Sequence, residues 1–290
     1  MRPAATASRK PPKVEGSAMN LILPLLDLQR LSAIAHRGGS KLRPENTLAA
    51  FDHATALGVD ALECDVHLSR DGEVVVIHDS TLERTTDARG SVAALTASEL
   101  ARVDAGFNFG AAEGFPFRGR AGGVPRLHDV IGRYPGPIII EVKGEDTGTA
   151  MRALGVIREH DALHRVIVGG FSPAVLAAVR REMPELVTSA SRAEARSALT
   201  RAYLWLTPHR PVFQLFQMPF RLQGKQIFGR GFVRAARRGG LPVHAWIVDD
   251  PADMRRLIAW GVTGIISDRP DVAIAVIKEL RESTRSHVGV

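Results

Sequence analysis

Four short segments of this 290-residue chain carry side chains that can do acid-base or metal chemistry at the end of an apolar run. Histidine titrates near neutral pH, and carboxylates without a cysteine cluster suit a hard, oxygen-seeking cation. The sequence therefore predicts Mg²⁺ or Ca²⁺ bound by Glu63, Asp65 and Glu141. Arg37 and Lys143 would supply fixed positive charge for an anionic substrate. The four segments are His36-Arg37, Glu63-x-Asp65, His78-Asp79 and Glu141-x-Lys143.

This combination of residue types favours phosphoryl chemistry over acyl transfer. His36 and His78 would act as general acid and base, because each follows an apolar run. The sequence has no Gly-x-Ser-x-Gly motif, which a serine hydrolase of the α/β type would carry. A purely structural alternative stays open, in which the carboxylates simply form ion pairs with Arg37 and Lys143.

The elements that position these side chains follow a regular alternation from residue 32 onward. Short apolar, β-branched runs alternate with segments of helical periodicity, which is typical of parallel strands covered by helices. Eight such strands predict an α/β fold of the (β/α)8 TIM-barrel type, in which the carboxyl ends of the strands share one face. The predicted strands are 32–36, 60–66, 137–143, 165–171, 186–191, 213–218, 243–248 and 264–268, and helices with clear ends are 47–57, 251–260 and 270–281.

Two segments depart from the alternation. Residues 73–79 read as a further strand after an Asp71-Gly72 turn, which indicates an antiparallel hairpin. A turn centred on this dipeptide would place His78 opposite Asp65. Residues 80–124 are too long for an ordinary connection, and we expect a small insertion that caps the barrel mouth.

The ends of the chain suggest one domain with a tail. Residues 1–20 are rich in Pro, Lys, Arg and Ala and are expected to be a disordered tail, and residues 21–290 a single barrel domain. The apolar run 21–26 predicts a short amphipathic helix that closes the bottom of the fold. It lacks a convincing cleavage site for secretion, and one Cys in 290 residues suits a reducing compartment, so we expect a cytoplasmic protein.

The net charge of +7 favours acidic partners such as phosphate substrates, anionic lipids or nucleic acid. No nucleic-acid-binding module is recognisable, so a nucleic-acid partner is not expected. A row of arginines at 230, 234, 237 and 238 is either a solvated surface or a site of peripheral contact with an anionic membrane. The aromatic stretch 203–220, which includes Trp205 and Phe220, suggests an apolar lip for an acyl chain.

The order and spacing of the motifs resemble the glycerophosphodiester phosphodiesterase family. The similarity runs from about residue 32 to residue 275. The matching motifs are His36-Arg37-Gly38-Gly39, Pro44-Glu45-Asn46-Thr47, Glu63-x-Asp65-Val66, His78-Asp79, Asp104-Ala-Gly106, Phe115-Pro-Phe117, Val124-Pro-x-Leu127, Glu141-Val-Lys143, Gly170-Phe-Ser172 and Gly261-Val-x-Gly264-Ile-Ile-Ser-Asp268-Arg-Pro270.

The resemblance implies a barrel that hydrolyses glycerophosphodiesters to glycerol 3-phosphate and an alcohol with the help of a divalent metal. It assigns His36 and His78 to acid-base catalysis, Glu63, Asp65 and Glu141 to the metal, Arg37 and Lys143 to the phosphate, and Trp246 to the wall beside the glycerol. Glu45 either contacts substrate or only starts a helix that Asn46 caps. Cleavage of lysolipids by the same site, in the manner of a lysophospholipase D, and a non-catalytic binding barrel remain as alternatives.

Overall fold

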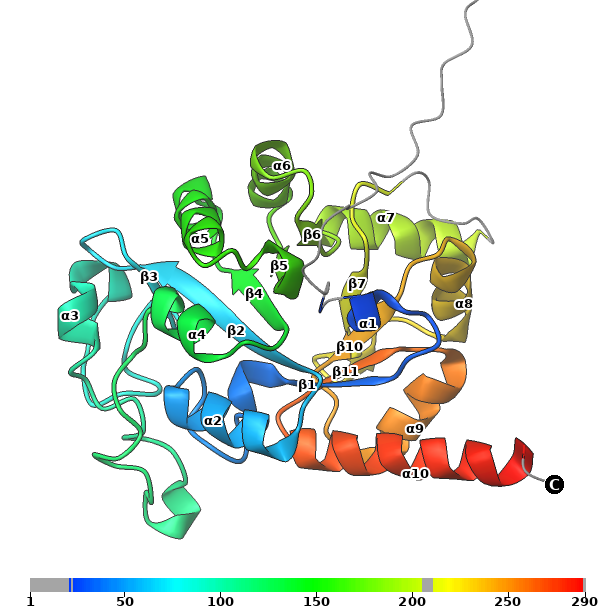
Figure 1. The fold of residues 1–290 in the computed structure, drawn as a ribbon, viewed down its shortest axis with the longest axis horizontal. Helices are drawn as coiled ribbons and strands as arrows, with labels where there is room; N and C mark the ends of the chain where they lie inside the picture. Colours follow the sequence, from blue (N-terminus) through cyan, green and yellow to red (C-terminus); the bar gives the residue numbers. More distant parts are fainter. Residues whose placement is uncertain (1–20, 22, 205–210, 289–290) are drawn as a thin grey trace, which may run out of the picture.

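Parallel strands form a curled sheet at the centre of the molecule (Figure 1). A computed structural model describes residues 21, 23–204 and 211–288 of the chain. Its main sheet has nine strands, of which only β3 is antiparallel, so eight parallel strands remain within the described residues. In spatial order they are β6 (Val187–Thr188), β5 (Val166–Gly170), β4 (Ile138–Val142), β2 (Ala61–Leu68), β1 (Ser32–Ala35), β11 (Gly264–Ser267), β10 (Val243–Trp246) and β7 (Phe216–Pro219).

Backbone hydrogen bonds beyond β6 and β7 close the ring. The amide of Gln214 donates to the carbonyl of Thr188 at 3.1 Å, and the amide of Ala190 donates to that of Leu215 at 3.0 Å. Ser189 and Leu215 form a parallel bridge rather than a continuous ladder. The predicted strands 186–191 and 213–218 are therefore shorter than expected, but the predicted TIM barrel is confirmed.

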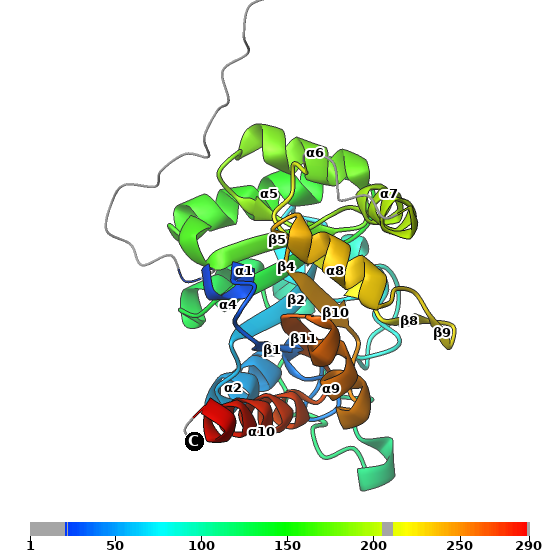
Figure 2. The same ribbon diagram turned by 90° about the vertical axis from the view of Figure 1, so that its right-hand side faces the viewer.

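In the described residues, each parallel strand is followed by a helix on the outside of the barrel (Figure 2). Pro251–Trp260 has the predicted bounds, and it ends at Gly261 with φ 101°, a left-handed conformation that glycine adopts without strain. The eight helices are α2 (Leu48–Leu57), α4 (Leu127–Arg133), α5 (Thr147–Glu159), α6 (Pro173–Glu182), α7 (Arg192–Tyr203), α8 (Arg230–Arg238), α9 (Pro251–Trp260) and α10 (Pro270–Val288).

The start of α2 corrects one prediction. Thr47, and not Asn46, caps this helix, because the Thr47 hydroxyl accepts a hydrogen bond from the amide of Ala50. Asn46 has a positive φ of 57°, and its side chain turns toward Asp65 instead.

The β2–β3 hairpin exists, but its predicted register is wrong by one residue. Val66 pairs with Val76 of β3 (Val74–Val76), and the amide of Ile77 rather than a group of His78 bonds to the carbonyl of Asp65. The cause is the loop, which spans three residues because the amide of Ser69 bonds to the carbonyl of Glu73.

The segment 80–124 packs on this hairpin. It contains α3 (Ala97–Leu100) and two short 3₁₀ turns, Val92–Ala94 and Ala111–Glu113. Leu82, Val92 and Leu100 are buried together against Val75 and Ile77. The insertion thus has a small apolar core of its own beside the barrel, and its role as a cap remains a proposal.

The bottom of the barrel is closed by α1 (Leu23–Leu26), as predicted. Leu25 is buried against apolar side chains of the barrel interior, and its carbonyl lies 2.9 Å from Nε2 of His244. A side chain at Gly264 would collide with the His244 ring, so glycine is required in the adjacent strand. The predicted tail 1–20 lies outside the described residues.

Three features of the outer surface bear on the sequence predictions. Phe220 is buried, so it does not form the expected lip, and Trp205 lies outside the described residues. Arg237 donates to the carbonyls of Leu28 and Gly261, so it holds the fold together instead of belonging to a free basic face. A short hairpin of two strands, β8 (Arg221–Leu222) and β9 (Lys225–Gln226), was not expected.

No helix of the described residues is long and apolar enough to cross a membrane.

Candidate active site

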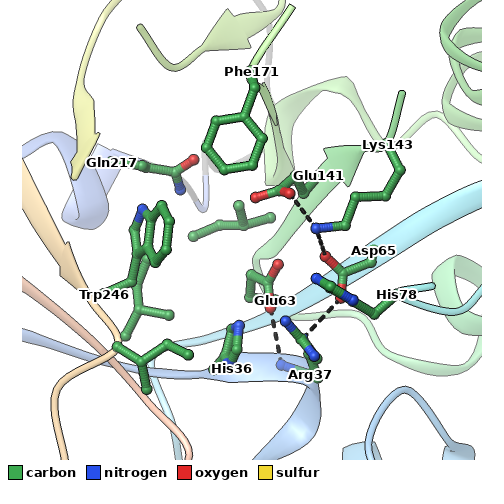
Figure 3. A pocket seen from close by; sticks show the side chains of 13 residues that line it. His36, Arg37, Glu63, Asp65, His78, Glu141, Lys143, Phe171, Gln217 and Trp246 are labelled. Atoms are coloured by element: carbon green, nitrogen blue, oxygen red, sulfur yellow. Dashed lines mark hydrogen bonds and ion pairs between the residues drawn. The ribbon is translucent and has the colours of Figure 1, made fainter. Parts of the chain in front are cut away.

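A cavity of about 180 Å³ opens at the carboxyl ends of the barrel strands (Figure 3). It gathers eight of the nine side chains that the sequence singled out, and Glu45 is the exception among them. The lining residues are His36, Arg37, Glu63, Asp65, His78, Ile139, Glu141, Lys143, Phe171, Gln217, Trp246, Ile247 and Ile266.

Three carboxylates converge in this cavity because of strand alternation and register. Glu63 and Asp65 lie two residues apart on β2, so they face the same side, and Asp65 is the register partner of Glu141 on β4. One oxygen from each carboxylate lies within 4.8 Å of the others. Glu63 and Asp65 are buried, so their charges have little water around them.

The electrostatics of this cluster fit a divalent cation. Burial and repulsion by Asp65 raise the pKa of Glu63 to about 8. For Asp65 burial acts in the same direction, but Lys143 and Arg37 outweigh it and hold the pKa of Asp65 below its ordinary value. A carboxylate that resists ionisation beside two others, with only oxygen donors in the cluster, matches the preference of Mg²⁺ or Ca²⁺.

Arg37 and Lys143 flank the carboxylates and also line the cavity. The backbone of Arg37 has a positive φ of 51°, and its amide donates to Glu63 at 2.9 Å. Nε of Arg37 lies 3.1 Å from Asp65 Oδ2, but its N–H is poorly aligned, so this contact is electrostatic. Lys143 Nζ lies 2.8 Å from Asp65 and also pairs with Glu141. The ion pairs of the carboxylates with Arg37 and Lys143, which the purely structural alternative expects, therefore exist in the same cluster.

Each histidine is oriented by an aspartate. Nδ1 of His36 lies 2.6 Å from Asp268, and Nδ1 of His78 lies 2.5 Å from Asp79, which leaves Nε2 of each ring for a substrate. Burial opposes protonation of His36, but the bond to Asp268 and the charge of Glu63 raise its pKa overall. Burial dominates for His78 and lowers its pKa. The pKa values of the two rings are therefore shifted in opposite directions.

Glu45 is not among the residues that line the cavity. Its carboxylate accepts bonds from Arg37 at 2.9 Å and from Arg84 of the insertion at 2.7 Å. Arg84 also donates to Asp79. One guanidinium therefore contacts both Glu45, which holds Arg37, and Asp79, which orients His78. The structure thus places Glu45 where it holds the Arg37 guanidinium, and its contact with a substrate stays a prediction.

Sequence reasoning missed several residues that support the site. Asp268 and Asn46 lie in recognisable motifs, but their contacts with His36 and Asp65 join distant parts of the chain. Gln217 was missed although it stands as a polar residue between Phe216 and Met218, which is an available signal on a buried strand. Its Nε2 is buried in the cavity wall without a partner in the described structure.

Two aromatic side chains shape the outer part of the cavity. The rings of Phe171 and Trp246 meet edge to face with centroids 5.9 Å apart. Trp246 thus lines the cavity, and its place beside the glycerol stays a prediction. Ser172, also at a strand end, has a local role instead, because its hydroxyl caps α6 and binds Glu145.

The barrel and its polar mouth place the chain among α/β-barrel enzymes that act on anionic substrates at the carboxyl ends of their strands. A family model, the glycerophosphoryl diester phosphodiesterase family, matches residues 36–272, and the chain belongs to this family. A glycerophosphodiester phosphodiesterase of Caldanaerobacter subterraneus subsp. tengcongensis is 33% identical over 258 residues, which are 85% of this chain and 97% of that protein.

Solved structures agree with this assignment. The glycerophosphoryl diester phosphodiesterase domain of a Mycobacterium tuberculosis protein superposes with a TM-score of 0.75 at 25% identity, covering 86% of this chain and 98% of that one. An Oleispira antarctica phosphodiesterase, solved in complex with its product sn-glycerol-3-phosphate, superposes with a TM-score of 0.68 at 25% identity, covering 84% and 96%.

Proposed function

We propose that this protein hydrolyses glycerophosphodiesters to glycerol 3-phosphate and an alcohol in a metal-dependent reaction. The observation that carries the proposal is the convergence of a three-carboxylate cluster, two cations and two Asp-supported histidines in one cavity. The product named for the Oleispira antarctica relative supports the substrate class.

Glu63, Asp65 and Glu141 would hold the divalent cation, Mg²⁺ or Ca²⁺. When bound, such an ion polarises the phosphodiester and neutralises the charge that develops on it. The raised pKa of Glu63 supports this role, because a cation at the cluster would favour the ionised carboxylate.

The protein's own side chains would move the protons and hold the anion. The pKa of His36 is raised, so His36 would donate a proton to the leaving alcohol. The pKa of His78 is lowered, so His78 would deprotonate the attacking hydroxyl group. Arg37 and Lys143 would bind the non-bridging phosphate oxygens. Nε2 of Gln217, which has no partner among the described residues, lies in the same wall and would bind a substrate oxygen.

An assay of the purified protein on glycerophosphocholine tests the proposal. We expect turnover with Mg²⁺ or Ca²⁺, loss of turnover with EDTA, and loss in the His36→Ala and His78→Ala variants. Equal turnover by the wild type and both variants under every condition would contradict it and would favour the alternative of a non-catalytic barrel.

The cellular setting remains part of this proposal. The single Cys64 is buried and free, which agrees with the cytoplasm that we expect. Arg230, Arg234 and Arg238 are exposed on α8, and they are the residues we assign to peripheral contact with an anionic membrane. Sedimentation with anionic and neutral vesicles measures this contact, and equal binding to both would exclude it.

A further inference from the structure

Arg84 belongs to the insertion, yet all three nitrogens of its guanidinium bind residues that support the active site. Nη1 and Nη2 each donate to one carboxylate oxygen of Glu45 at 2.7 Å, and Nε donates to Asp79 at 2.5 Å. Glu45 also accepts a bond from Arg37, and Asp79 binds Nδ1 of His78. A planar guanidinium fixes both the distance and the direction of such partners, whereas an ammonium group acts as a point charge.

The two histidines of the site differ in how firmly their aspartates are held. Asp268, which orients His36, directly follows β11 of the barrel, and its side chain is 14% exposed. Asp79, which orients His78, lies beyond β3, a strand that pairs with β2 outside the ring, and its side chain is 29% exposed. Burial opposes ionisation of Asp79, but the bonds from Arg84 and His78 lower its pKa to about 2. Arg84 therefore supplies support that the barrel itself gives to Asp268.

The core of the insertion fixes the turn that carries Arg84. Leu82 is fully buried in that core, two residues before Arg84. The side-chain amide of Asn108 lies 3.1 to 3.3 Å from the carbonyl oxygens of Glu83, Arg84 and Thr86. The backbone of this turn is thus held from two sides, and the insertion places a fixed guanidinium beside the mouth of the barrel.

Building on the proposed function, we propose that Arg84 is a positioning residue that aligns the phosphate-binding Arg37 with His78, the proposed base. Through Glu45 it holds the Arg37 guanidinium, and through Asp79 it holds the His78 ring. Arg84 is not among the residues that line the cavity, so it acts through these partners and not on the substrate. Alignment matters because a displacement of about 1 Å costs about 10² in rate.

Removal of the guanidinium in Arg84→Ala tests this inference. We expect kcat/KM for glycerophosphocholine to fall by about 10–100-fold, with a higher KM and a lower kcat, because both alignments are lost. Glu45→Gln should reproduce mainly the rise in KM, and Asp79→Asn mainly the fall in kcat. Arg89→Ala is the matched control, because Arg89 is an exposed arginine of the same insertion, and both constants should stay unchanged.

Two readouts distinguish positioning from general support of the fold. Guanidinium ion, added below the concentrations that unfold the protein, should raise kcat/KM of Arg84→Ala severalfold, because the Arg84 side chain is 47% exposed and its place is open to water. Sodium chloride at the same ionic strength should not. In a double-mutant cycle, Arg84→Ala with Asp79→Asn should lose no more activity than the more damaging single variant. Additive losses, or the absence of rescue, would overturn the inference.

Arg84→Lys covers the case in which Arg84→Ala does not fold. It keeps the charge but not the planar fork, so it should stay folded and lose activity in the same direction. Full activity of Arg84→Lys or of Arg84→Ala, with an active wild type, would overturn the inference and leave the proposed function intact. A wild type that does not hydrolyse glycerophosphocholine would instead count against the proposed function, and the inference would fall with it.

Discussion

The two ends of the barrel are built from the same strands but have opposite chemistry. On β2, Ala61 faces the interior at the bottom, and Glu63 and Asp65 follow at two-residue intervals toward the mouth. On β4, Ile139 precedes Glu141 in the same way. The bottom is sealed by Leu25 and other apolar side chains, whereas the mouth gathers buried charges.

This contrast shows how stability and function are separated along one strand. Burial of apolar groups at the bottom stabilises the fold. Burial and the charge of Asp65 raise the pKa of Glu63, so the ionised carboxylates at the mouth need a bound cation to become favourable. Changes at the two ends should therefore affect different measurements.

The largest expected effect is on catalysis and comes from the mouth. Removing the imidazole in His36→Ala or His78→Ala should lower kcat/KM by about 10²–10⁴ because general acid or base catalysis is lost. The melting temperature should stay within a few degrees, because both side chains lie at the cavity. Comparable losses of stability and activity would contradict the separation of the two ends.

A large effect on stability should come from the bottom. Ile167→Ala removes a fully buried side chain from the apolar cluster that contains Leu25, and it should lower the free energy of unfolding by about 2–5 kcal/mol. Urea denaturation measures this loss, and kcat/KM of the folded enzyme should change less than about twofold. A selective loss of kcat/KM would show that the bottom layer also shapes the site.

His244, at the bottom of the barrel, should make the stability of the fold depend on pH in the acidic range. Burial lowers the pKa of His244 to about 4 from an ordinary value of 6.5. The unfolded chain then binds the proton more tightly, so stability is complete above pH 6.5 and falls as the pH drops toward 4. The loss is about 3 kcal/mol. Urea denaturation of wild type, His244→Gln and the exposed control His128→Gln between these pH values measures it, and identical slopes in all three would refute the assignment.

The smallest expected effect is stabilisation of the fold by metal bound at the mouth. The pH dependence of stability that arises from Glu63 has the opposite sign to the one that arises from His244. The pKa of Glu63 is raised from 4.5 to about 8, so without metal stability falls as pH rises through this range. Mg²⁺ or Ca²⁺ at about 100 times its dissociation constant should restore about 2–3 kcal/mol. Thermal unfolding with EDTA or metal, at pH values above and below this range, measures it, and Glu63→Gln should abolish the response. A metal response that persists in Glu63→Gln would place the ion elsewhere.

Local patterns predicted the architecture and most of the site. Buried parallel strands have a near-continuous apolar pattern, and two-residue alternation along β2 is enough to place Glu63 and Asp65 on one face. The hairpin register was wrong because it depends on whether the loop has two or three residues. The buried position of Phe220 was not predicted, because aromatic composition alone does not distinguish a rim from a core.

Long-range partners were the other gap. Gln217 reaches the catalytic cavity only when β7 takes its place beside β10, and no local pattern encodes that neighbour. The short hairpin of β8 and β9 was missed because each strand has only two residues, which is too short for a periodic signal.

The pairing of His36 with Asp268 has a consequence for how activity arises during synthesis. The two residues are 232 positions apart, and the strands before them, β1 and β11, are neighbours in the ring. A nascent chain that ends before β11 already contains all three carboxylates, but His36 has no aspartate to orient it. Non-local contacts of this kind form late in folding. Turnover should therefore appear only after β11 has paired with β1, so activity would show that this last strand is in place.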